Sequence, residues 1–260
     1  MSAKTVLELM QWGPRGWLDE MVFATFLTLA VAIVSFLFGL GFGGLAAWGK
    51  LSRSRISAAA AETYTTVLRG IPDLLVIYLF YFGGGIALAA LAKALLGYDG
   101  FVALPGFLVG TLAIGLVSGA YQAEVIRGSW AAVPRGEIEA ARACGMSGGT
   151  LIRRVIGPQV LRYAVPGMGN IWQLVLKESA LVAVVGLTLH IAEIRVGDVL
   201  LLAETRFSDL LRQAYVAAGS TRQPFPFYLT CAAFYLVMTT VSTWGFARAE
   251  RWATRGLRRG

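Results

Sequence analysis

Charged residues are scarce in this chain, and so are the residue types that build most soluble active sites. Only 15% of the 260 residues are charged, whereas 57% are hydrophobic and the mean hydropathy is +0.65. This composition excludes an ordinary soluble domain. With a single histidine and two distant cysteines, Cys144 and Cys231, the chain shows no disulfide framework and no metal-ligand spacing. No nucleophile–base pair is recognisable either, which argues against a membrane enzyme.

Long uncharged runs fill much of the chain instead. Five segments reach the roughly 20 residues that cross a bilayer as a helix: 21–49, 74–92, 100–123, 163–192 and 223–247. The fourth segment joins two short apolar runs across a charged pair, Lys177 and Glu178. We therefore predict an all-α membrane protein with five transmembrane helices.

The distribution of basic residues gives the orientation of these helices. Basic residues gather at 50–55, at 127–162 and after residue 247, and the positive-inside rule places these parts in the cytoplasm. Residues 190–223 carry balanced charge, as expected on the periplasmic side. The N-terminus is therefore predicted outside and the C-terminus inside. We divide the chain into a periplasmic N-terminal segment, a transmembrane domain and a basic cytoplasmic tail: 1–20, 21–250 and 251–260.

Two patterns near the first two segments are interpreted as structural. Gly39, Gly41 and Gly44 form a GxGxxG pattern, but no β-strand is predicted before it. We interpret these glycines as helix-packing contacts, and the chain is not expected to bind ATP itself. The stretch 69–73, Arg-Gly-Ile-Pro-Asp, breaks the helical pattern before the second segment and predicts a bend rather than a chemical site.

A polar hairpin at 134–158 interrupts the apolar segments. Residues 137–143 predict a short helix with acidic residues in its first turn, where the helix dipole favours them. Glycines form the following turn, and a basic second helix is predicted over 151–156. Alanines at 140, 141 and 143 keep one side of the first helix thin, which favours the close approach of a partner. The alternative is an ordinary solvated loop.

The same hairpin resembles a known family. Glu139-Ala140-Ala141, Gly145 and Pro158 have the spacing of the EAA signature of bacterial ABC importer permeases. The stretches 118–128, 158–170 and 174–187 resemble the polar amino acid subfamily, which includes histidine and opine permeases. Gly157 departs from the signature, which usually has a large apolar residue there, and predicts weaker packing at the exit of the hairpin.

This resemblance implies a permease subunit of an ATP-driven importer with the type I fold, located in the bacterial inner membrane. Expected partners are a second homologous permease subunit, two ATPase subunits and a periplasmic binding protein. No cofactor is expected, since the ATPase subunits bind ATP. The hairpin would be the coupling helix that docks into the ATPase, through these residues: Glu137, Glu139, Ala140, Ala141, Arg142 and Gly145. Compared with the family, 189–208 resembles an insertion whose role is unknown.

Polar side chains within the predicted spans are candidates for a substrate path, because polar groups at that depth usually face a partner, a cavity or a transport route. Seven were selected: Tyr121, Gln122, Glu124, Gln173, Lys177, Glu178 and Ser179. Glu178 suits the ammonium group or a cationic side chain of an amino acid, and Lys177 suits its carboxylate. Alternatively, this subunit lines the gate while its partner holds the substrate, or the charged pair is purely structural.

Two other classes of function remain open from the residues. A secondary transporter driven by an ion gradient would show an internal repeat across ten or more spans. A membrane scaffold would need neither the coupling hairpin nor the charged pair. Among importer cargoes, the sequence does not choose between histidine, arginine, lysine, ornithine, octopine and nopaline.

Overall fold

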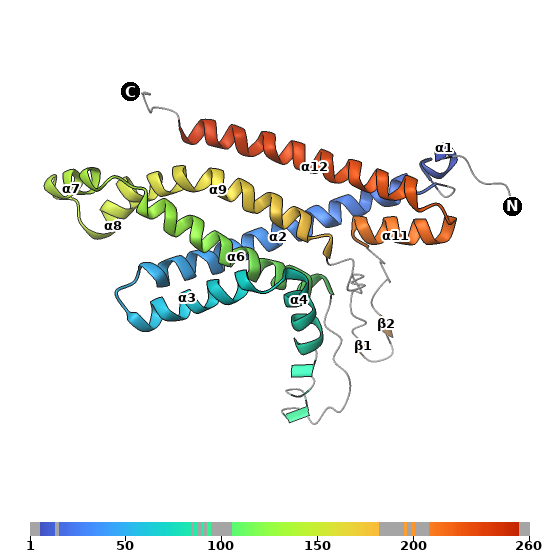
Figure 1. Cartoon of the computed structure of the whole chain (residues 1–260), viewed down its shortest axis with the longest axis horizontal. Coiled ribbons are helices and arrows are strands. Elements are labelled where there is room, and N and C mark those ends of the chain that lie inside the picture. Colours follow the sequence, from blue (N-terminus) through green and yellow to red (C-terminus); the bar gives the residue numbers. More distant parts are fainter. Residues whose placement is uncertain are drawn as a thin grey trace. The chain divides into compact units, whose positions relative to one another are not determined.

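Helices form most of the regular structure in the computed structural model (Figure 1). The structure describes residues 6–13, 16–84, 86–87, 90, 93–94, 106–181, 195–196, 199–200 and 208–254. The four longest helices are α2 (Leu18–Leu51), α6 (Gly106–Ala131), α9 (Gly157–Glu178) and α12 (Pro224–Ala253). The shorter ones are α1 (Val6–Leu9), α3 (Arg55–Gly70), α4 (Asp73–Tyr78), α7 (Arg135–Ala143), α8 (Gly148–Leu151) and α11 (Leu210–Thr221). Two π-helices, η1 (Leu79–Gly83) and η2 (Ile152–Ile156), complete the helical elements described.

Three helices are long and apolar enough to cross a membrane: Leu18–Leu51, Phe107–Ala131 and Pro224–Ala253. Three of the predicted segments are therefore confirmed as long apolar helices, although residues 100–105 lie outside the described part. Helix α3 passes the same test together with Asp73–Gly83, the two being bent by 108° at the break between them. The predicted bend at 69–73 is thus confirmed. The second half of the predicted segment 163–192, from residue 182, lies outside the described residues.

The chain divides into two compact units, and one boundary falls inside each of the four longest helices, while a fifth lies between α3 and α4. The first unit comprises residues 1–35, 71–114 and 175–238. The second comprises residues 36–70, 115–174 and 239–260. Each of the four long helices therefore contributes residues to both units.

Helix α11 of the first unit is fixed at its start by two polar contacts. The carboxylate of Asp209 caps the helix by accepting a hydrogen bond from the backbone N–H of Leu211 at 3.2 Å. The N–H of Leu210 donates to the hydroxyl of Thr28 on α2 at 2.9 Å. Edge-to-face packing of Trp17 on Phe227 adds an apolar contact, with ring centroids 6.1 Å apart. The contact between Leu210 and Thr28 holds α11 against α2, and the ring contact joins the residue before α2 to α12.

A pair of two-residue strands is the exception to the helical pattern in the described part of the chain. β1 (Arg195–Val196) and β2 (Val199–Leu200) pair antiparallel, with Arg195 opposite Leu200. Both lie in the segment 189–208 that the sequence singles out as an insertion. The rest of that segment up to residue 207 lies outside the described residues.

Close helix packing defines the second unit. A Cβ atom at Gly39 would lie 2.3 Å from the hydroxyl oxygen of Ser118, and one at Gly43 would lie 2.7 Å from the carbonyl oxygen of Gly119. Only glycine allows α2 and α6 to approach this closely. Gly41 and Gly44, in contrast, have nothing within 4 Å of that position in the described chain. The packing interpretation is confirmed for Gly39, whereas for Gly41 and Gly44 it stays a prediction, because the described residues of this chain provide no contact there. The sequence reasoning missed Gly43.

Helices α9 and α12 pack within the same unit around an aromatic side chain. Trp172 lies edge-on to Phe36, with ring centroids 5.6 Å apart, and its centroid is 6.5 Å from that of Phe246. Gly169 gives Phe246 room to approach, because a Cβ there would lie 3.1 Å from its ring. The guanidinium Nε of Arg162 donates to the carbonyl of Ala253 at 2.6 Å, which joins the start of α9 to the end of α12.

Candidate functional site

The hairpin predicted from the sequence is present and has a hydrophobic core of its own. Figure 1 shows α7 and α8 between the end of α6 and the start of α9. Four buried side chains form this core: Val133, Ala141, Leu151 and Ile156. Partly buried residues pack around them: Trp130, Ile138, Met146, Val155 and Val160. The hairpin is therefore a packed helical unit, and the solvated-loop alternative is wrong.

The turn of the hairpin depends on glycine. Gly145 has a φ of +80°, a conformation that L side chains rarely adopt, and its N–H donates to the carbonyl of Arg142 at 2.9 Å. The next N–H, from Met146, donates to the carbonyl of Ala141 at 3.0 Å. These two bonds close α7 in the manner of a glycine-dependent helix end. The spacing between the alanines and Gly145 thus sets where α7 stops.

The predicted docking residues lie on two different sides of α7. Glu137, Glu139, Ala140 and Arg142 are exposed, and so is Gly145 in the turn. Ala141 is only 8% exposed and packs inside the hairpin. The thin, exposed face of α7 is therefore formed by Ala140 and Ala143, whereas Ala141 allows α7 to approach the second half of the hairpin.

The exit of the hairpin explains the unusual Gly157. A Cβ at this position would lie 2.9 Å from the carbonyl oxygen of Ile152, which opens the π-helix η2. Ile156 supplies the buried apolar contact to the hairpin core. Gly157 therefore fits the wider π-helical turn, and the predicted packing defect is not found. The amide of Gln159 donates to the carboxylate of Glu137, which further joins α9 to α7.

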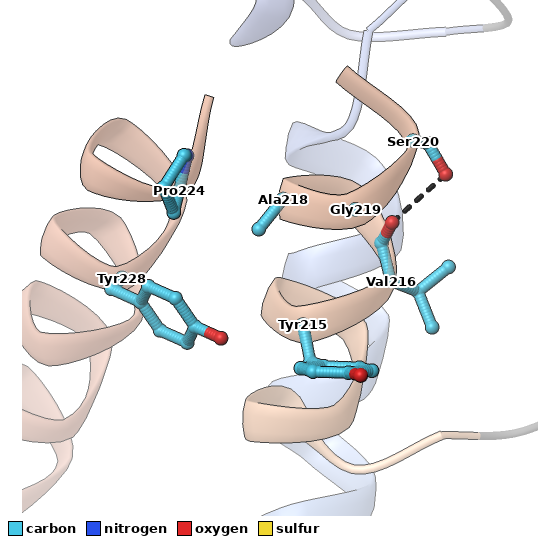
Figure 2. Close-up of a pocket in the computed structure, with 7 residues that line it drawn as sticks. All are labelled: Tyr215, Val216, Ala218, Gly219, Ser220, Pro224 and Tyr228. Atoms are coloured by element: carbon cyan, nitrogen blue, oxygen red, sulfur yellow. Dashed lines mark hydrogen bonds between the residues drawn. The ribbon is translucent and has the colours of Figure 1, made fainter. Parts of the chain in front are cut away.

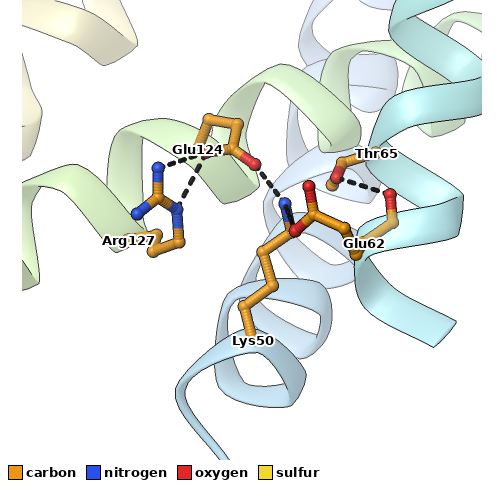
Figure 3. A network of polar contacts seen from close by, with 5 residues as sticks. All are labelled: Lys50, Glu62, Thr65, Glu124 and Arg127. Atoms are coloured by element: carbon orange, nitrogen blue, oxygen red, sulfur yellow. Dashed lines mark hydrogen bonds and ion pairs between the residues drawn. The ribbon is translucent and has the colours of Figure 1, made fainter. Parts of the chain in front are cut away.

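Glu124, a predicted substrate-path residue, takes part in an ion-pair network in the second unit (Figure 3). Lys50 pairs with Glu124 and also with Glu62, whose carboxylate lies 2.8 Å from its ammonium group. Arg127 contacts the other oxygen of Glu124 at 2.9 Å. The Lys50 side chain is only 4% exposed, so the network compensates a buried charge that joins α2, α3 and α6.

The other predicted residues on α6 contact neighbouring helices of the same unit. Gln122 is fully buried, and its amide nitrogen donates to the carbonyl of Phe36 at 3.2 Å. The guanidinium of Arg69 lies 5.4 Å from the ring centroid of Tyr121. On α9, the amide of Gln173 donates to the hydroxyl of Thr243 on α12 at 2.8 Å. Each of these side chains has a partner that holds two helices together.

The end of α9, in the first unit, carries the remaining predicted residues. Lys177 is exposed, whereas Glu178 is 5% exposed and neither of its carboxylate oxygens has a hydrogen-bond partner. Ser179 is buried and donates to the carbonyl of Leu176 at 2.7 Å. The carboxyl group of Asp73 lies beside that of Glu178. Sequence reasoning missed Asp73, although an acidic residue directly after Pro72 was visible in the 69–73 stretch.

A second buried polar group lies in the same unit, around the cap of α11. Asp209 is buried, and its oxygen Oδ1 has no hydrogen-bond partner. Burial disfavours the charged carboxylate and raises the pKa of Asp209 to about 7. The hydroxyl of Tyr235 on α12 lies near Ser179 and Thr28. Among the described residues, no group of three His, Cys, Asp or Glu side chains is arranged to hold a metal ion.

An open groove runs between α11 and α12 in the first unit (Figure 2). Tyr215 from α11 and Tyr228 from α12 project into it, and the guanidinium of Arg212 lies 5.6 Å from the ring centroid of Tyr215. Small residues of α11 complete the wall, among them Ala218 and Gly219. The groove contains none of the residues selected from the sequence.

The hairpin and its placement between two long helices agree with a family match. Residues 39–255 match the family described as "Binding-protein-dependent transport system inner membrane component". The chain belongs to this family. The permease is 53% identical over 254 residues to an octopine transport system permease protein of Rhizobium meliloti, covering 98% of both chains. It is 44% identical to a nopaline transport system permease protein of Agrobacterium fabrum, covering 97% of this chain and 98% of that one.

More distant relatives agree. The permease is 37% identical to the histidine/lysine/arginine/ornithine transport system permease protein of Escherichia coli, covering 89% of this chain and 92% of that one. Its structure resembles a chain of a crystal structure of an amino acid ABC transporter with histidines, with a TM-score of 0.71, 30% identity and coverage of 90% and 94%. A chain of the MetNI methionine ABC transporter shares the fold, with a TM-score of 0.59 at 16% identity and coverage of 92% and 96%.

Family membership decides between the classes that the residues left open. The chain is the permease subunit of an ABC importer, an inner membrane component that works with a binding protein and a separate ATPase. The alternatives of an ion-gradient transporter and of a scaffold without transport function are therefore wrong. The neighbours with known structure place it in the type I importer permease fold.

Proposed function

We propose that this permease is one half of a permease pair that imports a basic amino acid or an opine across the bacterial inner membrane. A periplasmic binding protein delivers the molecule, a second homologous permease subunit completes the path, and two ATPase subunits bind and hydrolyse ATP. The named cargoes of the relatives support this proposal, since they are octopine, nopaline and the basic amino acids histidine, lysine, arginine and ornithine. The permease itself needs no cofactor.

The proposed topology has five transmembrane helices, with the N-terminus in the periplasm and the C-terminus in the cytoplasm. Residues 1–20 then form a periplasmic segment, 21–250 the permease domain and 251–260 a cytoplasmic tail. The gathering of six arginines at 127–162 supports a cytoplasmic position for the hairpin 134–158. Single cysteines placed in each loop and labelled with a membrane-impermeant thiol reagent test on which side of the membrane that loop lies.

One observation carries the coupling role of the hairpin: its core residues face inward while a set of docking candidates is exposed. The set comprises Glu137, Glu139, Ala140, Arg142 and Gly145. Because the core holds α7 in a fixed position, movement of a docked ATPase displaces the ends of α6 and α9 with it. Ala141 contributes indirectly, by letting α7 pack on the rest of the hairpin.

The residues of the proposed substrate path have two different roles. Lys177, Glu178 and Ser179 at the end of α9 provide the polar groups that contact cargo. Tyr121, Gln122, Glu124 and Gln173 hold the helices that form the wall of the path, since each already contacts a neighbouring helix. We expect Glu124→Gln to lower the stability of the assembled transporter more than its apparent affinity for cargo.

The decisive experiment is coexpression of the permease with its binding protein, partner permease and ATPase, followed by affinity purification and uptake in proteoliposomes. We expect the ATPase to copurify and ATP to drive the uptake of L-arginine or octopine. Gly145→Asp places a charged side chain on the docking surface and should abolish copurification. Gly149→Asp is the control, because this exposed glycine is the second residue of α8 and has an ordinary φ. The proposal fails if no ATPase copurifies with the wild-type permease.

A further inference from the structure

Asp73, which is half-buried, and Glu178, which is buried, form an acidic pair in the first compact unit. The Glu178 side chain is 5% exposed, and both of its oxygens lack a hydrogen-bond partner. The carboxyl of Asp73 lies close enough to hydrogen-bond with it once one of the two groups carries a proton. Within the part of the chain that the structure describes, no ion pair involves either residue. Lys177, the neighbour in sequence, is exposed on another side of α9.

Two adjacent carboxyl groups are energetically unfavourable unless a proton or a cation binds to them. Two neighbouring carboxylates repel each other, so the site must take up a proton or a cation. A buried carboxylate without partners also loses its hydration with no compensating hydrogen bond. The buried ammonium group of Lys50 is compensated by carboxylates of the same chain, whereas the carboxylate oxygens of Glu178 have no hydrogen-bond partner. That difference indicates a ligand rather than an internal structural partner.

We propose that Asp73 and Glu178 together bind the positively charged side-chain nitrogen group of the transported molecule. This inference rests on the proposed importer function and adds Asp73 as a residue that determines specificity. Asp73 begins α4 directly after Pro72, and Glu178 ends α9, so the two carboxylates come from two helix ends. Paired carboxylates accept several N–H bonds at once, which suits a guanidinium group in particular. The cargo is then a cationic amino acid or a guanidinium-bearing opine.

The test uses the assembled transporter in nanodiscs, without the binding protein, and measures equilibrium binding of L-arginine, octopine and L-citrulline. Citrulline has the shape of arginine but a neutral ureido group. We expect the wild type to bind arginine or octopine and to discriminate against citrulline. Asp73→Asn and Glu178→Gln should each weaken this binding by at least about tenfold, as expected for the loss of a charged hydrogen bond.

Two further variants separate charge from structure. Asp73→Glu keeps the charge and should retain part of the binding, and Glu20→Gln neutralises an exposed carboxyl group of the same unit and should bind like the wild type. The inference is overturned if Asp73→Asn binds normally, if citrulline binds as well as arginine, or if only neutral cargo is imported. Loss of the assembled complex in both Asp73→Asn and Glu178→Gln would also overturn it. Failure of the importer proposal looks different, because the wild type would then show no ATP-driven uptake at all.

Discussion

The ammonium group of Lys50 lies 2.8 Å from the carboxylate of Glu62, yet one partner is buried and the other is not. The Lys50 side chain is 4% exposed and the Glu62 side chain 67% exposed. Lys50 therefore depends on its second partner, Glu124, for compensation inside the protein. This arrangement assigns Glu124 to the support of α2, α3 and α6.

The first prediction concerns this network. A double-mutant cycle of Lys50→Met and Glu124→Gln should give a coupling free energy of about 1–2 kcal/mol, because the two groups form a partly buried ion pair. The measurement is thermal unfolding of the purified complex in detergent. Glu62→Gln is the control and should lower stability by less than about 1 kcal/mol, as exposed pairs do. A coupling near zero would show that Glu124 is free for another role.

The second prediction separates the core of the hairpin from its surface. Ala141→Leu should lower stability by about 1–3 kcal/mol, because the added volume enters a packed core. Ala140→Leu should leave the melting temperature unchanged and reduce copurification of the ATPase, because Ala140 is exposed. Thermal unfolding and affinity purification of the two variants side by side check both expectations. Equal effects of the two substitutions on both measurements would contradict the division.

The third prediction uses glycines of one helix as matched controls. Gly43→Ala should destabilise the permease by about 1–3 kcal/mol, since the new methyl group would meet the carbonyl of Gly119 at 2.7 Å. Gly41→Ala should be neutral or stabilising by up to about 1 kcal/mol, because alanine favours helix and the position is open. Melting temperatures of the two variants decide the point. A destabilising Gly41→Ala would indicate a contact with another subunit.

The fourth prediction concerns the backbone at the hairpin turn. Gly145→Val should destabilise the hairpin by about 1–2 kcal/mol or more, because a β-branched residue does not adopt a φ of +80° without strain. Gly145→Asn should cost less, since asparagine tolerates this conformation. Limited proteolysis at the turn, compared with the wild type, reports the local opening. If Val and Asn behave alike, backbone strain is not the reason for glycine here.

The sequence was informative where a pattern is local. Run lengths predicted the long apolar helices, and the Ala-Gly spacing predicted both the hairpin and its turn. Which of Gly39 and Gly41 packs against α6 could not be predicted from the sequence, because it depends on which side of α2 faces α6. Both glycines lie in the same apolar run, and only the partner helix distinguishes them.

Contacts between distant residues account for the rest. Glu124 resembled a substrate-path residue because its partner Lys50 is 74 residues away in the chain. Asp73 was interpreted only as part of a bend, because its neighbour in space, Glu178, is far from it in sequence. Charge and depth can be read from one segment, but the identity of the neighbouring side chain requires the fold.

The self-contained core of the hairpin also bears on how such permeases diversify. Val133, Ala141, Leu151 and Ile156 carry the folding requirement, and none of them is exposed. The outward residues of α7 are free of that requirement. Substitutions there can therefore change which ATPase is recognised without repacking the interior. The hairpin is in this sense an exchangeable part, and a transplant of its outer residues alone should transfer partner choice between related permeases.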